Sequence, residues 1–291
     1  MEDQGYPALY CAANKASTDA QKQYLNFVRL YSFLLIASAG LGVYGINERN
    51  FAIIAALLIV GSIFLSIMML MKKDEDTWYR ARAVAESVKT SSWRFMMRAE
   101  PYSDAADVRE VKSRFRARLK YILGEHKDLS HHLGGVASEQ EQITGKMCEV
   151  RQLAWQERAS FYRAHRIDEQ RAWYAKKSAW NRVHGRMWFY ILIACQAFAV
   201  IFLFLRVAYP EWGYWPADIF VVGAGSALTW IQVKKFRELS AAYGVTAHEI
   251  GIVKGELELV DSEASLEAFI ADSENAFSRE HTQWLARKDS V

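Results

Sequence analysis

The stretch FAIIAALLIVGSIFLSIMMLM, residues 51–71, contains no charged side chain over its whole length. A helix rises about 1.5 Å per residue, so these residues would reach across a hydrocarbon layer of about 30 Å. The alternative, a buried helix in a soluble core, fits an uncharged run of this length poorly. The sequence therefore predicts an integral membrane protein.

A second uncharged run, residues 30–46, comes just before this stretch, and Arg29 at its edge can extend its charge towards water. Only NERN, residues 47–50, separates the two runs. We therefore predict two membrane-spanning helices, at about 28–46 and 51–71, joined as a tight antiparallel hairpin.

A second pair of spans is predicted further along the chain, at about 187–206 and 216–233. Residues 187–205 are uncharged, whereas the uncharged part of the last span covers only residues 219–233. The last span reaches back to residue 216 only if Asp218 lies at the membrane interface. The connection carries the aromatic residues that favour such an interface, Tyr209, Trp212, Tyr214 and Trp215.

Basic residues gather at the ends of both pairs that lie away from the short connections. They are Lys15, Lys22, Arg29, Lys72, Lys73, Arg182, Arg186, Lys234, Lys235 and Arg237. The connections themselves hold only Arg49 and Arg206. Because basic residues stay in the cytoplasm, we expect both hairpin tips outside and both termini in the cytoplasm.

Charged amphipathic helices are predicted outside the membrane, at about 74–99 and 104–133. The first has a face of mostly small residues at spacings of three and four, formed by Trp78, Ala81, Ala85, Val88, Ser92, Phe95 and Ala99. A lead-in helix with at least one break is predicted from about residue 137 to the third span. Residues 236–288 are also predicted to be helical, with breaks at Gly244, Gly251 or Gly255.

The two halves of the chain share one plan, which is a lead-in helix, a hairpin, two basic residues and then amphipathic helices. We expect an all-α integral membrane protein with four transmembrane helices in two hairpins and long, coiled-coil-like cytoplasmic helices. The first module is predicted to cover residues 1–135 and the second residues 136–291.

Three segments resemble signatures of SLATT domains. WYRARAVAESVKTSSWRFMMRAEPY, residues 78–102, is similar to the segment that follows the membrane hairpin in one subgroup of this family. RIDEQRAWYAKKSAWNR, residues 166–182, resembles the segment before the hairpin in another subgroup, and ENAFSREHTQWLARKD, residues 274–289, resembles the end of that subgroup. The resemblance covers nearly the whole chain as a tandem pair.

This resemblance implies a role as well as a fold. SLATT domains are two-span modules associated with nucleotide-second-messenger synthases and with nucleotide-sensing SLOG domains in prokaryotic conflict systems. The resemblance implies an anti-phage, abortive-infection effector that oligomerises with itself into a pore, or ion channel, in the bacterial inner membrane. The candidate triggers are a cytoplasmic sensor protein and a nucleotide second messenger. Alternatives are a passive scaffold that recruits a cytoplasmic partner, and a small housekeeping transporter or channel.

Candidate site residues fall into three groups. The candidates for lining a pore are polar residues of the second pair of spans: Gln196, Asp218, Ser226, Thr229 and Gln232. The candidates for close helix packing are small residues: Ala37, Gly40, Gly42, Gly45, Gly223 and Gly225. Candidates for an oligomer contact come from the first signature: Trp78, Arg82, Glu86, Lys89, Trp93 and Arg98, with Arg82 and Glu86 as an i,i+4 pair.

The sequence offers little for catalysis, and we expect no enzyme, cofactor or metal site. No phosphate-binding or dinucleotide-binding glycine motif is present, and Ser226 in GAGSAL does not match the nucleophile motif GxSxG. His131 and His132 are adjacent, so on a helix they would point about 100° apart. The basic run SRFRARLK, residues 113–120, spreads over more than one helix face. We interpret it as a solvated surface, with anionic lipid as an alternative, and expect no nucleic acid.

Overall fold

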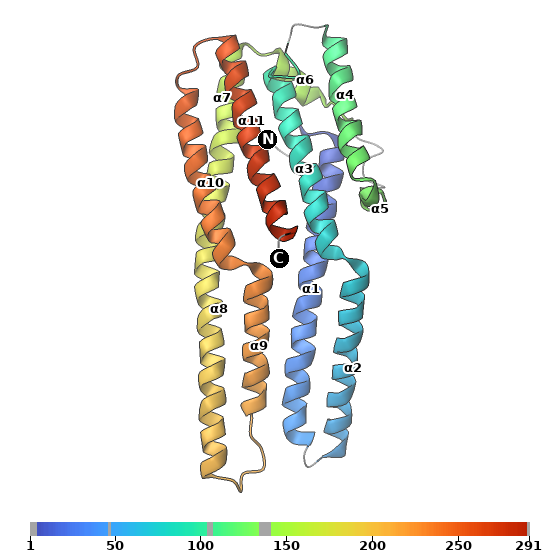
Figure 1. Cartoon of the computed structure of the whole chain (residues 1–291), viewed down its shortest axis with the longest axis vertical. Helices are drawn as coiled ribbons and strands as arrows, with labels where there is room; N and C mark the ends of the chain where they lie inside the picture. The colour runs from blue at the N-terminus through green and yellow to red at the C-terminus, as the bar shows by residue number, and fades with distance from the viewer. Residues whose placement is uncertain (1–4, 46–47, 104–106, 134–140, 290–291) are drawn as a thin grey trace. The chain divides into compact units, whose positions relative to one another are not determined.

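The computed structural model describes residues 5–45, 48–103, 107–133 and 141–289, and at residues 45, 130 and 278–289 it describes the backbone only. Every regular element within these ranges is a helix, so the predicted all-α class is confirmed (Figure 1). The α-helices are α1 (Ala8–Gly45), α2 (Arg49–Lys72), α3 (Asp74–Met97), α4 (Val108–Glu125), α5 (Ser130–Leu133), α6 (Gly145–Gln152), α7 (Trp155–Tyr162), α8 (Glu169–Ala208), α9 (Ala217–Lys234), α10 (Phe236–Leu257) and α11 (Glu263–Asp289).

Three helical segments in the described residues are long and apolar enough to cross a membrane: Ala8–Tyr44, Arg49–Met97 and Trp155–Ala208. They contain the predicted spans at 51–71 and 187–206 and the predicted span at 28–46 as far as Tyr44, and residue 46 lies outside the described residues. Helix α9 is not among them, and its 18 residues include Asp218 in the first turn and Lys234 in the last. The fourth span therefore stays a prediction.

The chain divides into two compact units that do not follow its two halves. The polar unit consists of residues 1–22, 74–173 and 246–291, and the apolar unit consists of residues 23–73 and 174–245. Each unit thus draws on both halves of the sequence.

Helix α3 forms the centre of the polar unit. It packs against α4, α6, α7 and α11, and Figure 1 shows it between α4 and α11. The predicted small-residue face is buried, whereas Trp78 at its start is only partly covered. The buried members are Ala81, Ala85, Val88, Ser92, Phe95 and Ala99.

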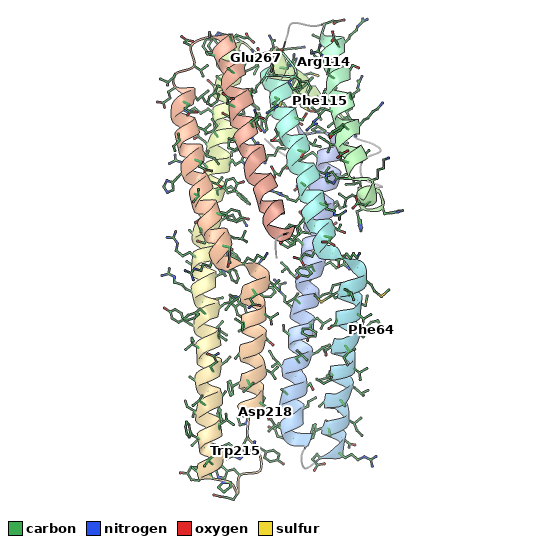
Figure 2. The ribbon with its side chains drawn as sticks, viewed as in Figure 1. Phe64, Arg114, Phe115, Trp215, Asp218 and Glu267 are labelled. Carbon is green, nitrogen blue, oxygen red and sulfur yellow. The ribbon has the colours of Figure 1, made fainter. Side chains whose placement is uncertain are left out.

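Helix α4 packs on α3 through an apolar stripe at helical spacing, formed by Val111, Phe115, Leu119 and Ile122. The Phe115 ring lies 5.0 Å from that of Phe95, centre to centre, whereas the next side chain, Arg114, is exposed (Figure 2). The helix predicted over residues 104–133 is shorter than expected. It ends at Glu125 and is followed by a 3₁₀ turn, Lys127–Leu129, and then by α5.

The lead-in helix contains the predicted break. Leu153 and Ala154 are extended between α6 and α7. From Trp155 the chain stays helical through a π-helical segment, Arg163–Asp168, into α8. A local π-helix of this kind often marks a functional position, because it shifts the register of the side chains around it.

The predicted breaks at glycines after the fourth span are wrong. Helix α10 continues through all three glycines and ends at Leu257. The reason is packing, since a Cβ at Gly244 would lie 3.3 Å from Ser178 Oγ and one at Gly251 would lie 3.6 Å from Arg171 Nε. Gly244 therefore lets α8 approach α10 closely, whereas the distance at Gly251 is that of an ordinary contact.

The two halves share an unusual corner. Helices α2 and α9 each end at a pair of lysines, and the second lysine, Lys73 or Lys235, has a positive φ of 50° or 46°. The next helix begins at the following residue, Asp74 or Phe236. A positive φ is uncommon for residues other than glycine. The same corner at equivalent positions supports the predicted repeat of one plan.

Candidate functional site

Small residues bring neighbouring helices together in the apolar unit. The Ser38 hydroxyl of α1 donates a hydrogen bond of 3.0 Å to the Ala55 carbonyl of α2. A Cβ at Gly61 would lie 3.5 Å from Leu34 Cδ1. Helices α8 and α9 meet through the stacked rings of Phe202 and Phe220, 5.4 Å apart.

The predicted packing glycines divide into two kinds. A Cβ at Gly40 would meet Ile219 Cδ1 at 3.8 Å, and one at Gly223 would meet Cys195 Sγ at 3.6 Å. Gly42 and Gly225 have no such neighbour within 4 Å. Ala37 is partly buried, and the side of Gly45 lies outside the described residues.

The candidate pore-lining residues lie on the outside of this single chain. Gln196, Thr229, Gln232 and Asp218 are exposed and Ser226 is partly exposed. The Thr229 hydroxyl donates to the Gly225 carbonyl at 3.0 Å. The two glutamine side chains, in contrast, make no hydrogen bond with the described residues. Of these two, Gln196 is at the middle of the uncharged residues 187–205.

Asp218 is the second residue of α9, which follows an aromatic loop (Figure 2). In that loop, Trp212 stacks on Tyr209 and on Trp215, each at 5.3 Å between ring centres. Tyr214 lies 5.1 Å from Tyr44 at the end of α1. These contacts form the compact aromatic cluster that an interfacial position would favour.

The polar unit brings the second and third signature segments together. Arg166, the first residue of one, forms a buried ion pair with Glu274, the first residue of the other, and their side chains are 1% and 0% exposed. Arg166 Nε donates to Glu274 Oε1 at 2.8 Å and Nη2 donates to Oε2 at 2.7 Å. The Tyr162 hydroxyl also donates to Glu274 Oε1 at 2.8 Å. The pKa of Tyr162 is raised well above its usual value, mainly by burial and next by the negative charge of Glu274. Tyr162 therefore stays a neutral donor.

The first signature segment joins the same cluster. Trp93 is fully buried, and its ring meets that of Tyr162 edge-on at 5.4 Å. Arg94 Nη2 donates to Asn275 Oδ1 at 2.7 Å and to the Ala271 carbonyl at 3.3 Å. Three segments that are far apart in the sequence therefore form one site in the polar unit.

Two further buried arginines hold the carboxyl end of α3. Arg151 donates to the Phe95 carbonyl at 2.5 Å and to the Tyr102 carbonyl at 2.8 Å. Arg158 donates to the Met97 carbonyl at 2.8 Å and also pairs with Glu263. Cationic donors suit the end of a helix, where carbonyl groups lack partners within the helix.

Sequence reasoning missed these arginines, although a signal was present. Arg151, Arg158 and Arg166 are seven and eight residues apart, which is about two helical turns each. Charged residues at such spacing are usually interpreted as a solvated face. Here they form the buried face of α6, α7 and the π-helical segment.

The remaining residues of the first signature lie nearer the surface. Arg82 and Glu86 form the predicted i,i+4 ion pair at 2.7 Å. Lys89 is partly buried and makes no ion pair with a described residue, and its burial lowers the pKa of its ammonium group. Arg98 Nε donates to the Arg151 carbonyl at 2.8 Å. The oligomer contact predicted for this signature stays a prediction, and Trp93 is already covered by its own chain.

Fold and site together define a class, an all-helical protein with helices of membrane-spanning length that is built from two related modules. The chain belongs to the SLATT family. Residues 7–159 match the SMODS and SLOG-associating 2TM effector domain 3, and residues 162–284 match the SMODS and SLOG-associating 2TM effector domain 1. The predicted tandem of two subgroups is confirmed. No curated protein and no solved structure matches the chain.

Proposed function

We propose that this chain is a membrane effector of a prokaryotic conflict system, such as anti-phage defence. It assembles with further copies of itself into a pore, and the pore permeabilises the inner membrane when a cytoplasmic sensor protein or nucleotide signal triggers it. Membership of a family of two-span effector domains supports the effector role.

The proposed topology has four spans in two hairpins, with α9 as the short fourth span and both termini in the cytoplasm. The lysine pairs after α2 and α9 support it, because basic residues stay on the cytoplasmic side. A cysteine in place of Glu211, in the connection before α9, should react with an impermeant maleimide added outside intact cells. Labelling only after the membrane is opened would contradict this topology.

The position of Gln196 is the observation that best supports a pore. Its amide is exposed at the middle of an uncharged helical stretch and has no hydrogen-bond partner among the described residues. In hydrocarbon an unpartnered amide costs several kcal/mol. A second copy of the chain or a water-filled path would supply the missing partner.

The pore predicts sensitivity to Gln196→Leu, a change that preserves size and removes the amide. Sealed liposomes that contain the activated full-length protein should release K⁺ or a small dye. Because the variant alters the polar lining, its release rate should be at least about tenfold lower. Val200→Leu, one turn further along α8 on an exposed apolar position, is the matched control and should retain the rate.

Liposomes that stay sealed under every activating condition would refute the pore. Release that is unchanged in Gln196→Leu would exclude this residue as part of the path. A scaffold predicts sealed liposomes together with capture of a cytoplasmic partner, and a transporter predicts saturable uptake of one substrate.

A further inference from the structure

Two cations from different helices of the apolar unit lie over the same indole ring. Arg29 Cζ of α1 is 5.1 Å from the centre of the Trp230 ring, and Lys234 Nζ of α9 is 5.9 Å from it. A second indole, Trp180 of α8, has Lys234 Nζ at 5.8 Å and Lys177 Nζ at 6.0 Å. We call Arg29, Trp180, Trp230 and Lys234 the cation–indole cluster.

This cluster concentrates positive charge. Arg29 and Lys177 both act on Lys234 as like charges. Arg29 donates to the neutral Asn26 side chain at 3.1 Å, and no acidic side chain among the described residues pairs with Arg29 or Lys234. Indole faces attract each cation but carry no net charge to balance them. The cluster therefore offers a site for an anion.

The sequence places the cluster at the edge of the apolar stretches. Arg29 is the last charge before the uncharged residues 30–46, and Lys234 is the first charge after the uncharged residues 219–233. Trp230 lies one turn inside that edge, at a depth that tryptophan favours in membranes. Lipid phosphates lie at this boundary, so a lipid brings its charge to the depth where the two cations are held.

We propose that the cation–indole cluster binds the headgroup phosphate of an anionic phospholipid. The phosphate lies between Arg29 and Lys234, and its glycerol and acyl groups follow the indoles and the apolar faces of the helices. Because Arg29 belongs to the first SLATT module and the other three residues to the second, one lipid would connect the two modules. Binding requires a membrane position for these helices and does not require a pore.

The test uses the full-length protein in an uncharged detergent and counts bound lipid by native mass spectrometry. The probes are phosphatidylglycerol and phosphatidylcholine with identical chains, with inorganic phosphate as a competitor. Phosphatidylglycerol should bind more tightly than phosphatidylcholine. Arg29→Gln and Lys234→Gln should each weaken its binding about fivefold, since each basic residue near acidic lipid contributes roughly that factor.

The matched control is Lys235→Gln, which removes the same charge at the next residue, where the described part of the chain makes no indole contact. It should stay within about twofold of the unchanged protein. Arg29→Lys and Lys234→Arg keep the charge and should keep the binding, so they separate charge from folding if a glutamine variant is unstable.

Three results would overturn the proposal. Equal binding of the two lipids would show that the headgroup charge is not recognised. Equal losses in Lys234→Gln and Lys235→Gln would show a diffuse charge effect rather than a site. Displacement of the lipid by millimolar inorganic phosphate would assign the cluster to a soluble anion.

Discussion

The polar unit and the apolar unit differ in where their charged and amide side chains lie. The polar unit buries charged groups such as Arg158, Arg166 and Glu274, and each of these has a partner inside the chain. The described part of the apolar unit buries no charged side chain and turns the amides of Gln196 and Gln232 outward. The buried charges of the polar unit therefore form ion pairs within the chain, whereas the exposed amides of the apolar unit form no hydrogen bond with the described residues.

The largest expected effect comes from breaking the buried ion pair. Glu274→Gln leaves Arg166 charged in a buried site, and we expect the free energy of unfolding of the polar unit to fall by about 3–5 kcal/mol. Thermal or denaturant unfolding, followed by circular dichroism, measures the change.

Asp128→Asn is the matched control, because it breaks an ion pair with Arg80 in which both side chains are about half exposed. Its effect should stay below about 1 kcal/mol. Equal losses in the two variants would contradict the distinction between a buried charged cluster and a solvated surface.

A smaller effect is expected from filling a close helix contact in the apolar unit. A Cβ at Gly185 would lie 3.1 Å from Phe236 Cβ, and Phe236 is buried. Gly185→Ala should lower stability by about 1–3 kcal/mol, as overpacking does. Gly255→Ala in α10 meets open space and should be neutral or stabilising by up to about 1 kcal/mol. Unfolding midpoints in one detergent would compare the two, and a stable Gly185→Ala would contradict the close packing.

The smallest expected effect concerns Lys89, whose folded pKa lies below its unfolded value near 10.5. The unfolded chain therefore binds more protons between the two values, so this group destabilises the fold at neutral pH and the loss disappears as pH rises to 10.5. Lys89→Met should be more stable than the original chain at pH 7, with a difference that shrinks towards high pH. An advantage that does not change with pH would refute this explanation.

Hydrophobic periodicity predicted the buried faces of α3 and α4, although it did not predict where α4 ends. Pairing across the sequence was not predictable from it. The Arg166–Glu274 ion pair joins residues 108 positions apart, and nothing local in either segment indicates its partner. Glycines were misleading in α10, because helix contact and helix termination favour the same residue.

The sequence predicted the candidate site only in part, because contacts between distant segments are not visible in a local pattern. The signature segments could be found from resemblance, yet their meeting in one buried cluster depends on the tertiary fold. Polar residues in the apolar helices could be named from the sequence, because an amide such as Gln196 stands out against uncharged neighbours. Which side of the helix they occupy required the structure.

The most direct test of the central claim is the electrical conductance of a planar bilayer that contains the full-length protein and its activating signal. A pore should give discrete current steps whose size falls in Gln196→Leu and is retained in Val200→Leu. A bilayer that remains insulating with active protein inserted, or steps that are identical in both variants, would contradict it.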